Sequence, residues 1–281
     1  MLRKKNKQTI KTSKHIVGYE DAMMTTGEHL EMLRQMLFRI LAVSGVITLL
    51  VFCFKDITWQ LLLAPSEWDF CTYRWIERTM QWMGIDFHFN EFHVEMIATN
   101  LSSQFMTHIT TAFYLGMLFA SPYILYELYR FISPALYENE RKYSVQVAGV
   151  IYVLFILGVQ MSYFVLFPIS FRFLGTYSVS ERVVSNITLD SYISTFVSLT
   201  LVMGIVFQLP MIAFFLGKMG IVSSSMLANY RKHSFIVIMM IAAIITPPDL
   251  MTLILVTIPL YLLYEISIRV VKWVEPRKLR C

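Results

Sequence analysis

Long apolar runs, separated by short polar segments, make up most of this chain. A membrane-spanning helix needs about 20 mostly apolar residues to cross a hydrocarbon core of about 30 Å. The apolar runs predict spans at Met36–Phe54, Leu101–Tyr129, Val145–Ile169, Tyr192–Leu216, Ser234–Thr246 and Leu250–Val271. The fifth run is short, because a helix over Ser234–Thr246 rises only about 20 Å. The pattern predicts an all-α integral membrane protein with six transmembrane helices.

Several residues mark where these helices start, bend or stop. Thr25 and Glu28 have the spacing of a capping box, which predicts that the first helix starts before its apolar run. The Pro247-Pro248 pair closes the fifth run and leaves almost no loop before the sixth. We expect structural roles for the prolines at such boundaries and bends, which are Pro65, Pro122, Pro134, Pro210, Pro247 and Pro248.

One segment outside the spans is large enough to have structure of its own. Residues 66–95 are rich in aromatic and acidic side chains. Within them, Tyr73, Ile76, Met80 and Met83 recur at helical spacing, which predicts a short amphipathic helix on the outer face of the membrane. We therefore expect a basic, mobile tail over 1–27, a six-span domain over 28–271 containing this insertion, and a second basic tail over 272–281.

Composition favours a membrane protein over a soluble one. The 281 residues are 56% hydrophobic and 15% charged, with a mean hydropathy of +0.57. Soluble domains are about 25% charged, so most of this chain does not lie in water. The net charge of +5 does not indicate a nucleic-acid partner, because the basic residues do not form one patch.

Lysine and arginine are instead distributed by side of the membrane. The connections between spans two and three and between spans four and five, together with both tails, hold most of them: Arg3, Lys4, Lys5, Lys7, Lys11, Lys14, Arg34, Arg130, Arg141, Lys142, Lys218, Arg231, Lys232, Arg269, Lys272, Arg277, Lys278 and Arg280, with Arg39 at the margin of the first span. The other side holds only Lys55, Arg74, Arg78, Arg172 and Arg182. Cytoplasmic loops carry the excess of such residues, so both termini are predicted to be cytoplasmic.

Sequence signatures of catalysis are missing. The chain shows no HExxH, GxSxG, Walker or GxGxxG pattern. Its three cysteines, Cys53, Cys71 and Cys281, are scattered and offer neither a disulfide framework nor metal-ligand spacing. We expect no enzyme activity, no cofactor and no metal site.

Three polar residues in or beside the last spans need an explanation. Gln208 precedes Pro210, and it either bonds backbone freed by that proline or lines a polar groove for a substrate or partner. Asp249 has the position of an N-cap for the sixth helix, a role that does not exclude contact with a partner. Glu265 is expected to pair with Arg269, one turn later.

Acidic residues also gather on the predicted cytoplasmic side. Glu31 stands with Arg34 before the first apolar run, while Glu138 and Glu140 lie in the loop after the second. Single surface charges are usually only solvated. Carboxylates from two separate segments, however, suit guanidinium groups, which form bidentate hydrogen bonds that lysine cannot match.

The motifs together resemble one family. The segment Glu28–Arg34 resembles the HLxELR entry of TatC, the core receptor subunit of the twin-arginine protein translocase. Similar matches, in the family's order, are Met96–Thr99, Ser121–Tyr126, Phe131–Arg141 (FIxPALYxxER), Phe207–Pro210 (FExP), Thr246–Asp249 (TPPD) and Pro259–Glu265 (PxxxLxE). The resemblance covers about Glu28 to Val271. The chain departs from the family pattern at Met32, Gln208 and Leu253, and its 66–95 segment is longer than usual.

The resemblance implies a fold and a function. It implies a glove-like bundle whose spans five and six are short, in a bacterial plasma (inner) membrane. It implies binding of twin-arginine signal peptides and export of folded proteins, driven by the proton-motive force. The implied partners are TatA/TatB-type single-span proteins, further copies of the chain in the same complex, and membrane lipid. The expected signal-peptide residues are Glu31, Arg34, Phe131, Glu138 and Glu140, and the expected partner or groove residues are Gln208, Thr246, Asp249 and Glu265.

Two other functions are weighed against this one. A small-molecule secondary transporter usually shows repeat-related halves and broken helices around a midplane site, which are not evident here. An accessory subunit of a membrane enzyme complex would co-purify with redox subunits rather than with signal peptides.

Overall fold

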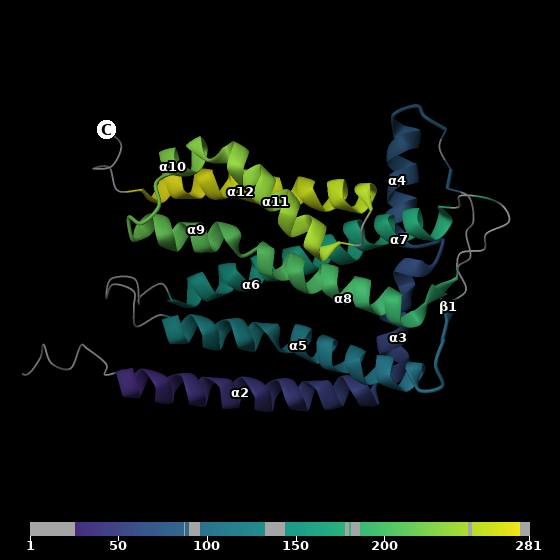
Figure 1. The fold of residues 1–281 in the computed structure, drawn as a ribbon, viewed down its shortest axis with the longest axis horizontal. Coiled ribbons are helices and arrows are strands. Elements are labelled where there is room, and N and C mark those ends of the chain that lie inside the picture. Colours follow the sequence, from purple (N-terminus) through teal and green to yellow (C-terminus); the bar gives the residue numbers. More distant parts are fainter. Residues whose placement is uncertain are drawn as a thin grey trace, which may run out of the picture.

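The structure is a computed structural model that describes residues 26–86, 88–89, 96–132, 144–177, 180, 186–246 and 249–275. Its long helices run side by side along one axis (Figure 1). In chain order the helices are α2 (Thr26–Cys53), α3 (Lys55–Leu63), the short 3₁₀ turn η1 (Ala64–Ser66), α4 (Cys71–Trp82), α5 (Ser103–Ile132), α6 (Ser144–Met161), the π-helical turn η4 (Ser162–Leu166), α7 (Phe167–Thr176), α8 (Leu189–Val206), α9 (Leu209–Lys218), α10 (Ser224–Asn229), α11 (Arg231–Ile245) and α12 (Leu250–Val274).

Five of the predicted spans match stretches of helix that are long and apolar enough to cross a membrane. Within the described residues these are Leu30–Cys53, Ser103–Phe131, Val147–Thr176, Leu189–Lys218 and Leu250–Val274. The predicted fifth span corresponds to α11, which has only 15 residues. The expectation that the sixth span is also short is wrong by helix length, because α12 has 25 residues and Pro259 does not end it.

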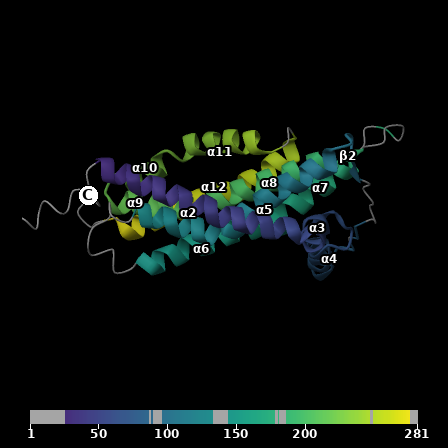
Figure 2. The same ribbon diagram turned by 90° about the horizontal axis from the view of Figure 1, so that it is seen from below.

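The two ends of the bundle differ. At one end, called the proximal end here, α2 begins and α5, α9 and α12 end (Figure 1). At the opposite, distal end, α3 and α4 lie across the long helices instead of along them (Figure 1). Turning the molecule shows α6 and α11 on opposite faces of the bundle (Figure 2).

The predicted amphipathic helix in the 66–95 segment exists as α4. Two of its hydrogen bonds are made beside Pro168. Pro168 cannot donate to the carbonyl of Phe164, four residues earlier. The Thr72 hydroxyl of α4 donates to that carbonyl instead, and the Tyr73 hydroxyl donates to the Pro168 carbonyl at 2.9 Å. Burial raises the pKa of Tyr73, against the opposing effect of Arg172, so its hydroxyl remains a donor. α4 is thus attached at the π-helical turn η4 and the start of α7.

A minimal pair of strands joins the segments that precede α5 and α8. β1 (Met96–Ile97) pairs in parallel with β2 (Ile187–Thr188). The sequence suggested no strand here, because two residues are too few to show an alternating pattern. The pairing holds the distal starts of α5 and α8 next to each other.

Close helix packing in the middle of the bundle depends on glycine. A Cβ atom on Gly158 of α6 would lie 2.5 Å from the Met203 carbonyl oxygen of α8, and one on Gly204 would lie 2.7 Å from the Phe155 ring. Small residues let membrane helices approach closely, and these two allow the α6–α8 contact.

Gly158→Ala is expected to destabilise the protein by about 1–3 kcal/mol, because the helices must separate to admit the methyl group. Gly149→Ala, on the same helix with nothing within 4 Å of its added Cβ, is the matched control. The measurement is the thermal unfolding midpoint in detergent. Equal midpoints for the two variants would show that the α6–α8 contact is looser than described.

Candidate recognition site

The proximal end collects most of the charged residues that the sequence singled out. The start of α2 and the end of α5 meet there, because these two helices pack against each other along their length in opposite directions (Figure 1). The ends of α9 and α12 and the start of α11 lie at the same end. The described lysines and arginines of this end are Arg34, Arg130, Lys218, Arg231, Lys232, Arg269 and Lys272.

The expected signal-peptide residues are only partly described. Arg34 Nη2 donates to Glu31 Oε1 at 2.8 Å and Gln35 Nε2 donates to the same oxygen at 3.1 Å, on a solvent-exposed turn. Phe131 is half-buried near the last turn of α5. Glu138, Glu140 and Pro134 lie outside the described residues. The structure therefore places Glu31, Arg34 and Phe131 at one end of the bundle but leaves the joint site untested.

A buried acid between α2 and α5 was not predicted as a site residue. The side chain of Glu127 is only 4% exposed, and Arg39 Nη2 of α2 lies 3.2 Å from its Oε2. The Tyr123 hydroxyl donates to its other oxygen at 3.0 Å. Charged groups within spans usually pair in this way. One sequence signal could have indicated this site: Tyr123 and Glu127 are four residues apart, so they share one side of a helix. Arg39 lies near the middle of α2, because that helix begins at Thr26.

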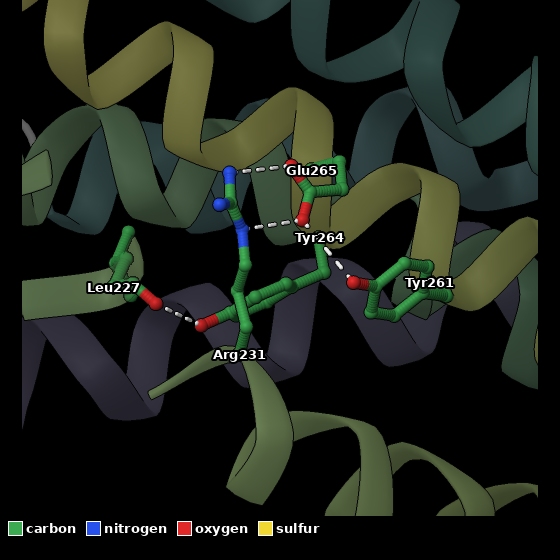
Figure 3. Close-up of polar contacts among 5 residues, drawn as sticks. All are labelled: Leu227, Arg231, Tyr261, Tyr264 and Glu265. Atoms are coloured by element: carbon green, nitrogen blue, oxygen red, sulfur yellow. Dashed lines mark hydrogen bonds and ion pairs between the residues drawn. The ribbon is translucent and has the colours of Figure 1, made fainter. Parts of the chain in front are cut away.

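A second ion pair joins α11 to α12. Arg231 donates from Nε to Glu265 Oε1 at 2.8 Å and from Nη2 to Oε2 at 3.0 Å, a bidentate contact (Figure 3). The Tyr261 hydroxyl also donates to Oε1 at 3.3 Å (Figure 3). The expected Glu265–Arg269 pair is therefore wrong. Sequence spacing suggested a partner on the same helix, whereas the fold brings a better-oriented guanidinium from α11.

Two more polar contacts attach the short helix α10 to α12. The Tyr264 hydroxyl donates to the Leu227 carbonyl at 2.7 Å (Figure 3). Buried Glu275 accepts from the Ser224 hydroxyl at 2.6 Å, at the start of α10. With the Arg231–Glu265 pair, these contacts fix the proximal connection between α9 and α11 against α12.

Loss of the Arg231–Glu265 pair is expected to lower stability by about 1.5 kcal/mol, the lower part of the range for charge-assisted bonds, since Arg231 is 48% exposed. Arg231→Gln and Glu265→Gln should have similar effects that do not add in the double variant. Arg269→Gln is the matched control and should change little. A thermal-unfolding double-mutant cycle in detergent measures this, and a loss at Arg269 equal to that at Arg231 would contradict the pairing.

The expected partner or groove residues do not form one cluster. Gln208 stands where α8 ends and α9 begins, and its Nε2 donates to the Ile151 carbonyl of α6 at 3.1 Å. Thr246, at the end of α11, bonds its own helix through Ala242. Asp249 caps α12 as predicted, accepting from the Thr252 amide at 2.7 Å. Glu265 lies about four turns further along α12. Gln208 therefore bonds backbone, but not the backbone freed by Pro210, because its acceptor belongs to α6.

The described residues form a groove between α5 and α8. It has a volume of about 490 Å³, and Thr107, Thr110, Ser194 and Ser198 give it a polar lining among apolar side chains. At one end, Asp190 accepts from the Ser103 hydroxyl at 2.7 Å and from the Thr107 hydroxyl. Gln208 does not line this groove. Asp190 was not singled out because it lies just before the predicted fourth span. Among the described residues, no three His, Cys, Asp or Glu side chains are placed to hold a metal ion.

Comparison with known proteins identifies the family. Residues 28–259 match the family model described as Sec-independent protein translocase protein (TatC). The chain belongs to the TatC family. It is 34% identical to the TatC protein of Blattabacterium sp. subsp. Periplaneta americana over 89% of this chain and 96% of that protein. It is 30% identical to the TatC protein of Carboxydothermus hydrogenoformans over 92% of this chain and 97% of that protein.

Solved TatC structures have the same fold. A crystal structure of the twin-arginine translocase receptor TatC matches with a TM-score of 0.70 and 30% identity, over 88% of this chain and 99% of that one. The resemblance seen in the sequence motifs is therefore confirmed, and this TatC-family chain is a membrane component of Sec-independent protein translocation. The family consists of protein translocase components and is not a family of known enzymes.

Proposed function

We propose that this TatC-family chain is the receptor of a twin-arginine translocase and binds the signal peptides of folded cargo proteins at the proximal end. The observation that carries the proposal is the meeting of the α2 start, with exposed Glu31, and the α5 end; Glu138 and Glu140 follow α5 in the sequence. Glu31 is 47% exposed, so its carboxylate is accessible to a peptide arginine. Arg34 holds this carboxylate in place, and half-buried Phe131 lies in the last turn of α5, before the acidic residues in the sequence.

The proposal includes an orientation and a membrane. The proximal end carries more lysine and arginine than the distal end, which suits a cytoplasmic position for the proximal end and for both termini. Counting the 15-residue α11 as a span gives six crossings in a glove-like bundle. A helix this short requires local thinning of the bilayer or support from neighbouring helices. The membrane is the bacterial plasma (inner) membrane.

Single-span proteins of the TatA/TatB type are the proposed partners, in a complex with further copies of this chain that uses the proton-motive force. The α5–α8 groove offers hydroxyl groups within an apolar surface, and such groups hydrogen-bond across membrane helices. Ser198 at its edge contacts the Ile245 carbonyl at 3.5 Å, which brings the end of α11, near Thr246 and Asp249, beside the groove. Gln208 bonds α6 and Glu265 bonds Arg231 of α11, so both stabilise the bundle away from this groove.

The experiment that tests receptor function is photo-crosslinking of a twin-arginine peptide to the purified full chain. A crosslink is expected at the start of α2 and in the loop after α5, and a peptide with two lysines in place of the arginines should crosslink weakly. Equal crosslinking of both peptides, or crosslinks confined to the distal end, would overturn the proposal.

Orientation is tested separately by thiol labelling of intact cells. Cys71 begins α4 and is exposed, so it should react with a membrane-impermeant reagent, whereas Cys281 should react only after cell lysis. Labelling of Cys281 from outside would reverse the assignment.

A further inference from the structure

The surface of α4 that faces away from the bundle has no role in the function proposed above. α4 differs from the other long helices in direction, because it lies across the distal end (Figure 1). Because α4 crosses the direction of the spans at the distal end, beside α7, it runs along the membrane plane (Figure 1).

The side chains of α4 divide into three stripes along its length. At 100° per residue, Thr72, Tyr73, Ile76, Glu77 and Met80 share one side. This side is the attached one: Thr72 and Tyr73 are buried, and Glu77 accepts from the Phe89 amide at 2.7 Å. At Tyr73 the apolar spacing seen in the sequence therefore marks contact with protein, while Ile76 and Met80 are half-buried and Met83, just past the helix, is 53% exposed.

The second stripe is aromatic and exposed. Trp75 and Trp82 are two turns apart on the same side of the helix, with Cys71 in line. Their exposed fractions are 69% and 88%. Tryptophan is enriched at membrane–water interfaces, because its ring has an apolar body and a polar N–H.

The third stripe is basic and lies directly beside the aromatic one. It consists of Arg74, Arg78 and Gln81, all exposed. Arg74 also pairs with Asp69 at 3.2 Å, so its charge is partly compensated. Adjacent tryptophan and arginine stripes match the adjacent acyl and phosphate layers of a phospholipid surface.

We propose that the Trp75–Trp82 stripe of α4 inserts into the membrane surface while Arg74 and Arg78 bind anionic phospholipid headgroups. α4 is then an interfacial anchor that holds the distal end at a fixed depth. This role accounts for α4 in the long 66–95 segment, and Thr72 and Tyr73 connect the anchor to the π-helical turn η4 and the start of α7. This inference does not depend on signal-peptide binding.

Depth is tested with spin labels on the full chain in phosphatidylcholine–phosphatidylglycerol vesicles. In a Cys53→Ser/Cys281→Ser variant, a label on Cys71 reports the aromatic stripe. The matched control replaces Cys71 by Ser as well and carries its label at Gln81→Cys in the basic stripe. The Cys71 label should collide more with oxygen dissolved in lipid than with a water-soluble nickel chelate, and the Gln81 position should show the reverse. A Cys71 label open to nickel, or protected from both reagents by a protein, overturns the proposal.

Headgroup preference is tested by tryptophan quenching. The fluorescence that is lost in the Trp75→Phe/Trp82→Phe variant is the part that comes from Trp75 and Trp82. Brominated phosphatidylglycerol should quench this part more strongly than brominated phosphatidylcholine does at equal mole fraction. Arg74→Gln/Arg78→Gln should lower this preference by about 5- to 30-fold. Neither arginine contributes to the α4 attachment through Thr72 and Tyr73, so the variant should fold. Equal quenching by both lipids in the unsubstituted protein overturns the headgroup assignment.

Discussion

Arg39→Met is expected to destabilise the protein by about 3 kcal/mol, the lower part of the range for breaking a buried ion pair. The reason is that Glu127, with 4% of its side chain exposed, loses the cation that compensates its charge. Arg39 itself is 45% exposed, which keeps the loss at the lower part of the range. The measurement is the thermal unfolding midpoint in detergent, converted to free energy where unfolding is reversible.

Two further variants separate this effect from general damage to α2. Arg34→Met removes an arginine from an exposed pair on the same helix and should cost at most about 1 kcal/mol. Arg39→Met/Glu127→Gln removes the buried charge but keeps an acceptor for Tyr123, so it should recover most of the loss. If the double variant is as unstable as Arg39→Met alone, the ion pair is not the cause.

The sequence predicted the elements that depend on local pattern. Apolar runs located the long helices, since a bilayer requires about 20 apolar residues whatever the fold. Asp249 was identified as a cap because the N-cap hydrogen bond joins residues only three apart. The helix α4 was found from the spacing of Tyr73, Ile76 and Met80, although that spacing did not reveal that its apolar side contacts protein.

Contacts between distant segments were not predictable in the same way. Glu265 had an apparent partner at i+4, and nothing in the chain indicated that α11 would bring Arg231 closer. The Thr72–Phe164 hydrogen bond joins residues far apart in sequence, and only the missing amide of Pro168 hinted that a carbonyl there needed a donor. Among the candidate site residues, Glu31 and Arg34 are exposed at the end where they were expected, while Gln208 and Thr246 bond backbone within the bundle.

Recognition of paired arginines requires the proposed site to offer acceptors on two sides of the peptide. Successive side chains of an extended peptide point in opposite directions, so two adjacent arginines need acceptors on two sides. Glu31 lies on α2, and Glu138 and Glu140 follow α5 in the sequence, while the start of α2 and the end of α5 meet at the proximal end. Arg34 already bonds one oxygen of Glu31, which leaves its other oxygen to a peptide guanidinium. One acidic segment alone would leave one arginine without a partner.

Glu140→Ala is therefore expected to weaken twin-arginine peptide binding by roughly 10–150-fold, the equivalent of one lost charge-assisted contact of about 1.5–3 kcal/mol. Glu31→Ala should weaken binding less, because Arg34 shares that carboxylate. Peptide titration of the purified chain and export of a twin-arginine reporter measure the two effects. Glu67→Ala, an exposed acid of the distal end, is the matched control and should bind normally. Membrane insertion should survive in every variant, since none of these residues lies in an apolar span. If Glu31→Ala and Glu140→Ala together leave binding and export unchanged, these carboxylates are not the acceptors, although membership of the TatC family would stand.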